Sequence, residues 1–445
     1  MNSLDKIREA GIVGAGGAGF PTHVKLNTKA EIIIANGVEC EPLLRVDQQV
    51  MGVETPLVIQ GLQLSMSATG ASKGVICLKG KYTKAIEKLE QYLSHVKEDI
   101  TLAIIDSYYP AGDEQALVYE VTKKVVPTGG IPIAAGAVVL NVSTLLNIAK
   151  AMTGEAVFRK YVTVTGEVAT PKTLLAPIGT PISRLILEAG GVVNKENYSL
   201  ILGGPAMGQV TDDWEQAVTK TLGGIIVLPK THSLIQKKTA PLDFQIKLAR
   251  SVCCQCNQCT MLCPRKTLGL STSPHKAMRA LAYGCGQGIE PEEVVSCCEC
   301  GVCSYFACPM GLAPSRVMGK MKAEFLQKKI PFEKTKSIGV SEIRTFKNLP
   351  TTRLVNRLGL KSYDKEAPLE SEELSVTKVN IPLKQHIGAP SIPIVKVGQK
   401  VEKGEKIATI PEGALGANVH GSISGIVSDI DDRFIGINKT YIPEE

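Results

Sequence analysis

Eight of the thirteen cysteines stand in two runs whose spacing suits iron–sulfur clusters. The first run reads C-x2-C-x2-C-x3-C before a proline, and it comprises Cys253, Cys256, Cys259 and Cys263. The second run has four residues before its last cysteine, and it comprises Cys297, Cys300, Cys303 and Cys308. Three thiolates two residues apart wrap a short loop around one face of a cubane, and in two-cluster ferredoxins the fourth ligand comes from the other run. We therefore predict two [4Fe–4S] clusters, one bound by Cys253, Cys256, Cys259 and Cys308 and the other by Cys297, Cys300, Cys303 and Cys263.

Zinc is the alternative because it also binds C-x2-C pairs, but zinc sites use two separated pairs and each run here holds three cysteines close together. Cys254 and Cys298 do not fit the spacing, and we expect both to pack beside the clusters. Cys40, Cys77 and Cys285 are expected to be buried thiols. In the reducing cytosol, metal binding is a better explanation for so many cysteines than a disulfide framework.

A second set of candidate residues lies near the N-terminus, in a glycine-rich loop and at the ends of predicted strands. Five glycines fall within Gly11–Gly19, and the N–H groups of such a loop suit a phosphate, although a plain turn is equally typical of the pattern. The strand EIIIAN leads into NGVECEP at 36–42, and the segments YPAGDEQ at 109–115 and LNVST at 140–144 follow. Acidic and amide groups at strand ends are where an α/β sheet contacts its ligand.

These four segments, in this order, resemble the flavin- and NADH-binding subunit of respiratory complex I, in which they read GRGGAGFPT, NADESEPG, YxxGEExAL and NNVET. The whole chain is similar to the C subunits of Rnf complexes, and most to their cobalamin-reductase branch, through GIVGAGGAGFPTHVKL, ECEPLLRVDQQ and CCECGVC with ACPMGL. The resemblance implies an FMN and NADH site with catalytic positions at Glu39 and Glu41. The cofactor-binding positions that it implies are Gly14, Gly16, Gly17, Gly19, Lys25, Asn36, Glu114, Asn141 and Thr144. Ala15, Val38 and Asp113 depart from the complex I pattern, which has Arg, Asp and Glu there.

The length of 445 residues exceeds what one core holds, so we predict a multidomain α+β protein. The resemblance implies an α/β flavin-binding domain at 1–154, a β-grasp (SLBB) module at 155–240 and a helical two-[4Fe–4S] ferredoxin-like domain at 241–330. A linker at 331–372 and a barrel-sandwich hybrid at 373–445 complete the chain. Lipoyl and biotinyl domains share this last shape and carry a modified lysine at a hairpin tip, but the matching positions 416–421 contain no lysine.

Composition limits the remaining classes of function. The net charge of +7 is mild and no block of Lys and Arg is present, which argues against nucleic-acid binding. Positions 125–149 carry no charged residue but contain prolines and glycines, which predicts a buried strand and helix rather than a membrane span. The N-terminal residues lack the features of a signal peptide, so we expect a cytoplasmic protein, in free solution or inside a bacterial microcompartment.

The resemblance implies an NADH-dependent oxidoreductase that passes electrons from FMN through two [4Fe–4S] clusters to a corrinoid. The alternatives are a subunit that feeds electrons to an amino-acid reductase of the proline reductase type or to an Rnf-like membrane complex, and a relay or adaptor protein without catalysis of its own. The expected partners are NADH and a corrinoid or redox-protein acceptor, within a homo-oligomer or a larger redox complex.

Overall fold

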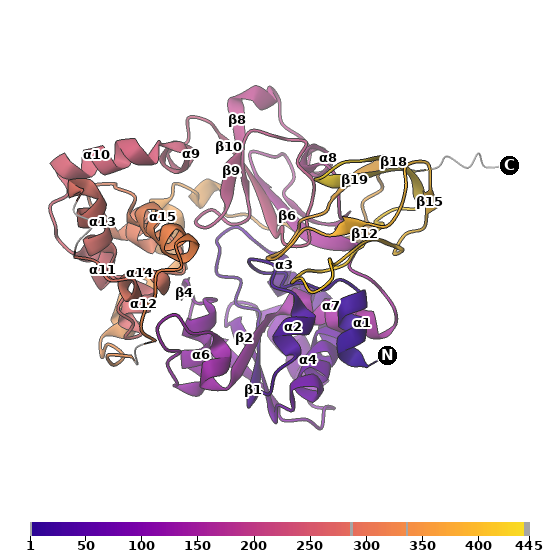
Figure 1. Ribbon diagram of the computed structural model, residues 1–445, viewed down its shortest axis with the longest axis horizontal. Helices are drawn as coiled ribbons and strands as arrows, with labels where there is room; N and C mark the ends of the chain where they lie inside the picture. Colours follow the sequence, from indigo (N-terminus) through magenta and orange to yellow (C-terminus); the bar gives the residue numbers. More distant parts are fainter. Residues whose placement is uncertain (1, 285–287, 335–336, 440–445) are drawn as a thin grey trace.

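The structure is a computed structural model that describes residues 2–284, 288–334 and 337–439. Four parts surround one another in Figure 1: the N-terminal domain (2–154) at the bottom, the β-grasp domain (155–240) at the top, the cysteine-rich domain (241–330) on the left and the C-terminal domain (373–439) on the right. Cys285, for which we predicted a buried thiol, lies outside the described residues.

The N-terminal domain is built on a parallel sheet with the strand order β3-β2-β1-β5. In β1, Ile33 and Ala35 pack into one hydrophobic core and Ile34 into another on the opposite face, which is why the strand is apolar throughout. The strands are β1 (Ile32–Asn36), β2 (Lys73–Lys79), β3 (Ile100–Ile105) and β5 (Ala137–Asn141). The helices are α1 (Ser3–Glu9), α2 (Thr22–Leu26), α3 (Val46–Val53), α4 (Thr55–Thr69), α5 (Thr83–Leu93), α6 (Glu114–Thr122), the 3-10 turn η1 (Pro132–Ala135) and α7 (Val142–Met152).

The charge-free stretch 125–149 forms β5 and α7, as its sequence predicts. Asn141 ends the strand and begins the helix, because its side-chain oxygen accepts a hydrogen bond of 2.9 Å from the N–H of Ser143. Helix α7 crosses α4 very closely at Gly61, where an added β-carbon would lie only 2.0 Å from the carbonyl oxygen of Leu145. No helix in the described parts of the chain is long and apolar enough to cross a membrane.

The β-grasp domain contributes most of a six-stranded sheet with the order β12-β7-β6-β10-β8-β9. The antiparallel pair β6 and β7 is followed by a helix, α8. The strands are β6 (Arg159–Gly166), β7 (Lys172–Pro177), β8 (Tyr198–Leu202), β9 (Gln209–Thr211) and β10 (Gly224–Pro229), with helices α8 (Ile182–Glu188), η2 (Lys195–Asn197) and α9 (Ser233–Thr239).

Short helices and loops form the cysteine-rich domain. Helices α13 and α15 pack through Ala277, Met278, Val317 and Met318 around a small core of their own. The helices are α10 (Leu242–Val252), α11 (Gln258–Met261), α12 (Pro264–Thr267), α13 (Pro274–Tyr283), α14 (Glu292–Val295), the π-helical turn η3 (Cys303–Ala307) and α15 (Pro314–Gln327).

The segment 331–372, predicted as a linker, contains short elements that join other parts of the molecule. Strand β11 (Leu349–Pro350) pairs with β4 (Tyr108–Tyr109) of the N-terminal domain, and β12 (Leu369–Glu373) pairs with β7 of the β-grasp domain. Helices α16 (Arg344–Lys347) and α17 (Thr351–Arg357) and the turn η4 (Lys361–Tyr363) lie between them. Strands of two to five residues carry almost no sequence pattern, because their stability comes from their partner strands.

The C-terminal domain is a small sandwich of two sheets, with the orders β13-β19-β18-β15 and β14-β16-β17. Val379, Val427 and Ile437 from one sheet and Ile407 and Val419 from the other are buried in the same core. The strands are β13 (Lys378–Pro382), β14 (Ile392–Pro393), β15 (Lys400–Val401), β16 (Lys406–Thr409), β17 (Val419–His420), β18 (Gly425–Ile430) and β19 (Phe434–Asn438).

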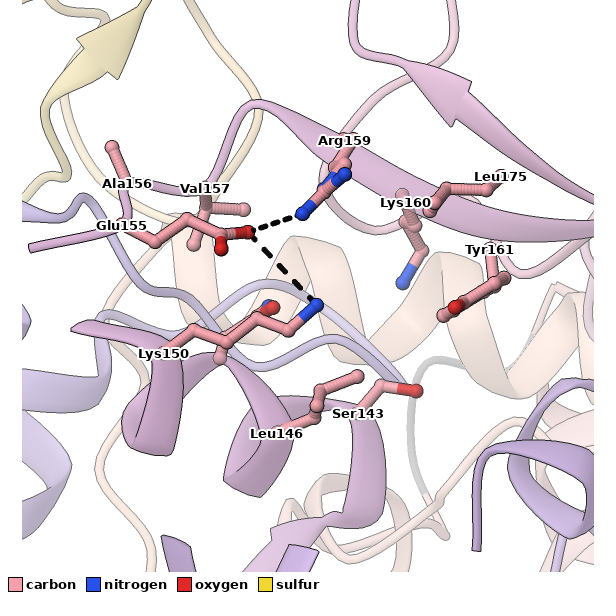
Figure 2. Close-up of a pocket in the computed structure, with 11 residues that line it drawn as sticks. Ser143, Leu146, Lys150, Glu155, Ala156, Val157, Arg159, Lys160, Tyr161 and Leu175 are labelled. Carbon is pink, nitrogen blue, oxygen red and sulfur yellow. Dashed lines mark hydrogen bonds and ion pairs between the residues drawn. The ribbon is translucent and has the colours of Figure 1, made fainter. Parts of the chain in front are cut away.

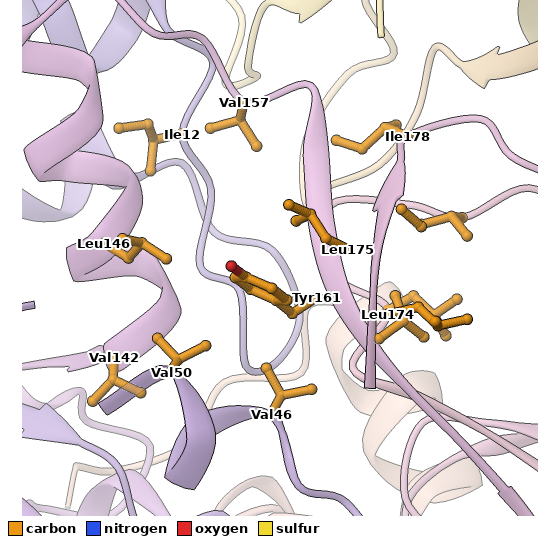
Figure 3. Packing of buried hydrophobic residues seen from close by; sticks show 14 of the residues in the cluster. Ile12, Val46, Val50, Val142, Leu146, Val157, Tyr161, Leu174, Leu175 and Ile178 are labelled. Carbon is orange, nitrogen blue, oxygen red and sulfur yellow. The ribbon is translucent and has the colours of Figure 1, made fainter. Parts of the chain in front are cut away.

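One hydrophobic core continues through the N-terminal, β-grasp and C-terminal domains. Figure 3 shows Tyr161 and Leu175 of the β-grasp sheet facing Val50 and Leu146 of α3 and α7. Because burial of this apolar surface favours a single arrangement, the β-grasp sheet is held firmly behind the ends of β1 and β5.

Candidate functional site

The carboxyl ends of β1 and β5 meet where the order of the sheet changes direction. From β1 the chain proceeds to β2 and β3 on one side and then returns to place β5 on the other side. Asn36 and Asn141, the last residues of these two strands, are direct partners in the register. Ligands of open α/β sheets bind at such a switch point, beyond the carboxyl ends of the strands. The structure therefore brings these two predicted residues together at the expected place.

The glycine loop is anchored directly against this switch point. The N–H of Ala15 donates to Oγ1 of Thr144 at 2.9 Å, and Nζ of Lys160 donates to the carbonyl of Ala15 at 3.1 Å. A β-carbon on Gly16 would lie 2.7 Å from Nδ2 of Asn141, so only glycine permits this approach. Thr144 and Asn141 thus hold the loop as well as lining the site.

The other predicted glycines serve the loop in different ways. The N–H of Gly14 donates to the carbonyl of Phe20 at 2.9 Å and closes the base of the loop. Gly17 lies at the exposed tip, where an added β-carbon would meet no atom within 4 Å. Gly19 has a φ of +74°, a left-handed conformation that favours glycine. The exposed tip suits the oxygens of a phosphate, whereas Gly14 and Gly19 maintain the shape of the loop.

Lys25, Asn36 and Glu114 make contacts with other parts of the N-terminal domain. Nδ2 of Asn36 donates to the carbonyl of Gly112 at 2.9 Å, which fixes the turn before α6. Glu114 is the first residue of α6, and its carboxylate pairs with Nζ of Lys25 at 2.8 Å. Because the side chain of Glu114 is 48% exposed, this ion pair is weak, and Lys25 is free to exchange Glu114 for a ligand phosphate.

Glu39 and Asp47 form a partly buried pair of carboxylates at the start of α3. Glu39 accepts hydrogen bonds from the N–H groups of Asp47 at 2.9 Å and Gln48 at 3.4 Å. Asp47 accepts from Nδ2 of Asn141 at 2.8 Å and from Oγ of Ser143 at 3.4 Å. Burial, followed by the charge of Glu39, raises the pKa of Asp47 to about 7, and burial also raises the pKa of Glu39. Sequence reasoning missed Asp47, because an acid in the first turn of a helix is ordinary.

A small cavity of about 30 Å³ lies behind the glycine loop, between α7 and β6 (Figure 2). Three cations line it, and two of them, Arg159 at 2.9 Å and Lys150 at 3.9 Å, pair with Glu155. The third, Lys160, is buried, which lowers its pKa to about 8, while the charge of Asp47 acts in the opposite direction. Lys150 also pairs with Glu54 at 3.9 Å and Arg159 with Glu373 at 3.1 Å, so the charges around the cavity are balanced. The glycine cradle fits the phosphate of FMN.

Glu41 has hydrogen-bond partners that differ from those of Glu39 and Asp47. Its carboxyl group lies 2.8 Å from the hydroxyl of Tyr109 and accepts hydrogen bonds from the N–H groups of Ala206 at 2.9 Å and Met207 at 3.2 Å. Burial is the largest influence on Glu41 and raises its pKa. Glu39 adopts a left-handed φ of 42°, and the chain beyond it turns toward the β-grasp domain. Glu41 therefore connects the N-terminal domain with the β-grasp domain.

The cysteines of one predicted cluster surround a cavity near the surface, and we name them the outer cysteine group: Cys253, Cys256, Cys259 and Cys308. All four line the same cavity of about 30 Å³. After burial, the charges of Cys308, Cys253 and Cys256 raise the pKa of Cys259 to about 12. Such mutual repulsion shows that the sulfurs lie close together, and a cationic iron core would relieve it. These residues fit a [4Fe–4S] cluster, with Cys256 exposed.

The cysteines of the other predicted cluster form a more buried set, which we name the inner cysteine group: Cys263, Cys297, Cys300 and Cys303. After burial, Cys297 and Cys263 contribute most to the raised pKa of Cys303, and Cys259 of the outer cysteine group contributes next. The spacing predicts that each cluster takes its fourth ligand from the other run. The thiols that lie together in the structure agree with this prediction. The two groups are neighbours, as electron transfer between clusters requires.

The two extra thiols differ from each other in their surroundings. Cys254 is exposed, and it lines the same cavity as the outer cysteine group, beside the predicted cluster. Cys298 is partly buried and approaches Arg265, whose guanidinium pairs with Asp113 of the N-terminal domain at 2.6 Å. Within the described residues, no three or more His, Cys, Asp and Glu side chains are arranged to hold a single metal ion.

Comparison with protein families assigns each of the four parts. The Nuo51 FMN-binding domain matches residues 7–150, the SLBB domain 161–210, the 4Fe-4S dicluster domain 252–313 and the RnfC barrel sandwich hybrid domain 356–441. These matches confirm the predicted fold class and the predicted cofactors. The fold and the sites define an NADH-linked electron-transfer flavoprotein with iron–sulfur clusters, and hence an oxidoreductase.

Comparison with individual proteins narrows this class. The chain is 42% identical to cobalamin reductase PduS of Salmonella typhimurium strain LT2 over 97% of this chain and 95% of that protein, and 41% identical to PduS of Citrobacter freundii over the same shares. The chain belongs to this family. It is also 35% identical to the C subunit of the Na⁺-translocating ferredoxin:NAD⁺ oxidoreductase complex of Acetobacterium woodii, over 58% of this chain and 56% of that one. A solved NAD⁺-reducing [NiFe]-hydrogenase aligns with a TM-score of 0.48 and 19% identity over 77% of this chain and 65% of its own, too distant to support an argument.

Proposed function

We propose that the chain oxidises NADH at an FMN bound over the ends of β1 and β5, and that the two clusters pass the electrons to a corrinoid. One observation carries the proposal: the inner cysteine group lies directly against the flavin-binding domain. The hydroxyl of Tyr109 is 2.7 Å from the carbonyl oxygen of Cys300, and Arg265 pairs with Asp113 at 2.6 Å with both side chains almost buried. A contact of this kind gives electrons a short route from one domain to the other.

The residues at the switch point would orient the flavin nucleotide and leave its chemistry to the cofactor. The tip of the glycine loop and Lys25 would hold the phosphate, and Asn36 and Asn141 would lie beneath the ring system. Bound FMN supplies the ability to accept two electrons from NADH together and to release them one at a time. Glu39 and Asp47 would fix α3 against the nucleotide, since both are bound to main-chain and side-chain donors.

The exposure of the two cysteine groups suggests the direction of transfer. Cys263, Cys300 and Cys303 of the inner cysteine group are buried, whereas Cys256 of the outer cysteine group is exposed. An acceptor from solution can therefore approach the outer cysteine group more closely. The corrinoid is supported by the full-length likeness to proteins named cobalamin reductase.

An anaerobic assay with the cofactor-loaded protein, NADH and aquacobalamin tests the proposal. We expect the visible spectrum to show reduction of the corrinoid. The background control contains free FMN, at the same concentration, in place of the protein. Cys256→Ala should keep the reduction of ferricyanide, which takes electrons from a flavin, and lose most of the corrinoid reduction. Ferricyanide reduction by the unmodified protein without corrinoid reduction would show that the acceptor is another molecule. Full corrinoid reduction by Cys256→Ala would show that the outer cluster does not lie on the electron path to the corrinoid.

A further inference from the structure

The hydroxyl group of Tyr109 joins three domains at one point. Tyr109 is only 2% exposed, and its Oη lies 2.7 Å from the carbonyl oxygen of Cys300 and 2.8 Å from Oε1 of Glu41. Glu41 is held in turn by the N–H groups of Ala206 and Met207 in the β-grasp domain. Cys300 belongs to the inner cysteine group. The hydroxyl is thus the bridge between the flavin-binding domain and a proposed cluster ligand.

A count of hydrogens determines how this bridge is polarised. A tyrosine hydroxyl has one hydrogen to donate, and the carbonyl of Cys300 can only accept. If Tyr109 donates to Cys300, the contact of 2.8 Å with Glu41 needs a hydrogen from the carboxyl group. Burial raises the pKa of Glu41, which favours the carboxyl form that supplies this hydrogen. The chain then runs from the carboxyl of Glu41 to the hydroxyl of Tyr109 and on to the carbonyl of Cys300.

We propose that Tyr109, directed by Glu41, is a positioning residue that donates a hydrogen bond to the Cys300 carbonyl and raises the reduction potential of the inner cluster. This inference rests on the ligand set in the proposed function but not on the donor or the acceptor. Hydrogen bonds around the ligands are among the features that set the potential of an iron–sulfur cluster. Reduction adds negative charge, and a hydrogen atom directed at the ligand loop stabilises that charge in a site with little water.

The bridge also explains why this part of the flavin-binding domain is so closely packed. An added β-carbon on Gly204 would lie 2.0 Å from Oε2 of Glu41, so the β-grasp loop packs directly against the carboxyl group. Tyr109, Cys300 and Ala206 belong to the same hydrophobic core, which keeps water away from the hydrogen bonds. Replacement of the hydroxyl by water is therefore unfavourable in the native protein.

The test compares Tyr109→Phe with Tyr108→Phe. The hydroxyl of Tyr108 is also buried, but it contacts Glu120 at 3.1 Å and Arg344 at 3.2 Å and not a cluster ligand. The two midpoint potentials of the fully loaded protein are measured by anaerobic redox titration with chemical mediators, followed by electron paramagnetic resonance. Since neither NADH nor a corrinoid is present, failure of the proposed function would not affect this result.

We expect Tyr109→Phe to lower the midpoint potential of one cluster and to leave the other unchanged, while Tyr108→Phe changes neither. If Tyr109→Phe does not take up its full iron, Tyr109 is replaced by 3-fluorotyrosine instead. The hydroxyl of 3-fluorotyrosine is more acidic and a stronger donor, so it should raise the midpoint potential of the inner cluster. Unchanged potentials in the variant that loads fully, or an equal shift in Tyr108→Phe, would overturn the inference.

Discussion

The close crossing of α4 and α7 behind the flavin-binding site leads to a prediction about two helical glycines. Gly61 of α4 faces α7, and an added β-carbon would lie 2.0 Å from the carbonyl oxygen of Leu145 and 2.6 Å from its carbonyl carbon. Ordinary contact begins near 3.4 Å, so α7 would have to move by more than 1 Å. Gly52 of α3 is also helical, but an added β-carbon there would meet no atom within 4 Å.

The pair of variants separates helix propensity from packing. Alanine in place of helical glycine gains up to about 1 kcal/mol in either helix. Overpacking costs about 1–3 kcal/mol where side chains can adjust, and the obstacle at Gly61 is backbone, which cannot rotate away. We therefore expect Gly61→Ala to be less stable than Gly52→Ala by about 1–3 kcal/mol or more. Movement of α7 would also displace Asn141 and Thr144, which hold the glycine loop.

Thermal unfolding and bound flavin are the two measurements. Gly52→Ala should match or slightly exceed the melting temperature of the unmodified protein and retain its FMN after gel filtration. Gly61→Ala should melt several degrees lower than Gly52→Ala and release FMN more readily. Equal stability and equal FMN retention in the two variants would refute the reasoning that this crossing positions the flavin site.

Two further predictions concern titration and the cysteines. The raised pKa of Asp47 means that the folded protein keeps a proton up to about pH 7 that the unfolded chain releases near pH 4. The stability due to this proton is therefore complete below pH 4 and is lost as the pH rises to 7, by up to about 4 kcal/mol. Asp47→Asn should show a smaller fall in melting temperature between pH 5 and pH 7.5, and an equal fall would contradict the assignment. An iron assay tests the ligand set: Cys256→Ala should lose about half of the bound iron. The control Cys254→Ala, which removes the neighbouring exposed thiol, should keep all of it. The reverse pattern would refute the ligand set.

The main parts of the fold were predictable from sequence because each depends on a local pattern. The cysteine spacing specified which thiols lie together, since three ligands of each group fall within seven residues. The apolar strand at Ile32–Asn36 and the strand and helix around Asn141 were recognised from periodicity and end residues. These elements also bring Asn36, Asn141 and Thr144 to one sheet edge, because parallel strands end on the same side.

The residues that sequence reasoning missed depend on contacts between distant segments. Lys160 reaches the carbonyl of Ala15 only because the β-grasp sheet packs behind the glycine loop. Asp47 becomes unusual only when Glu39 and burial are known. The resemblance implies one site for Glu39 and Glu41, and the left-handed turn at Glu39 gives the two carboxyl groups different partners. The strands at 349–350 and 369–373 form by adding to existing sheets and have little pattern of their own.

The most direct test of the central claim is an anaerobic visible spectrum of the purified protein before and after NADH is added. The proposed path from NADH through FMN to the clusters predicts that both the flavin band and the broad cluster absorbance bleach. Dithionite added afterwards measures how much of each remains to be reduced. Clusters without flavin, or absorbance that dithionite bleaches and NADH does not, would contradict the path and favour a relay protein that receives its electrons from elsewhere.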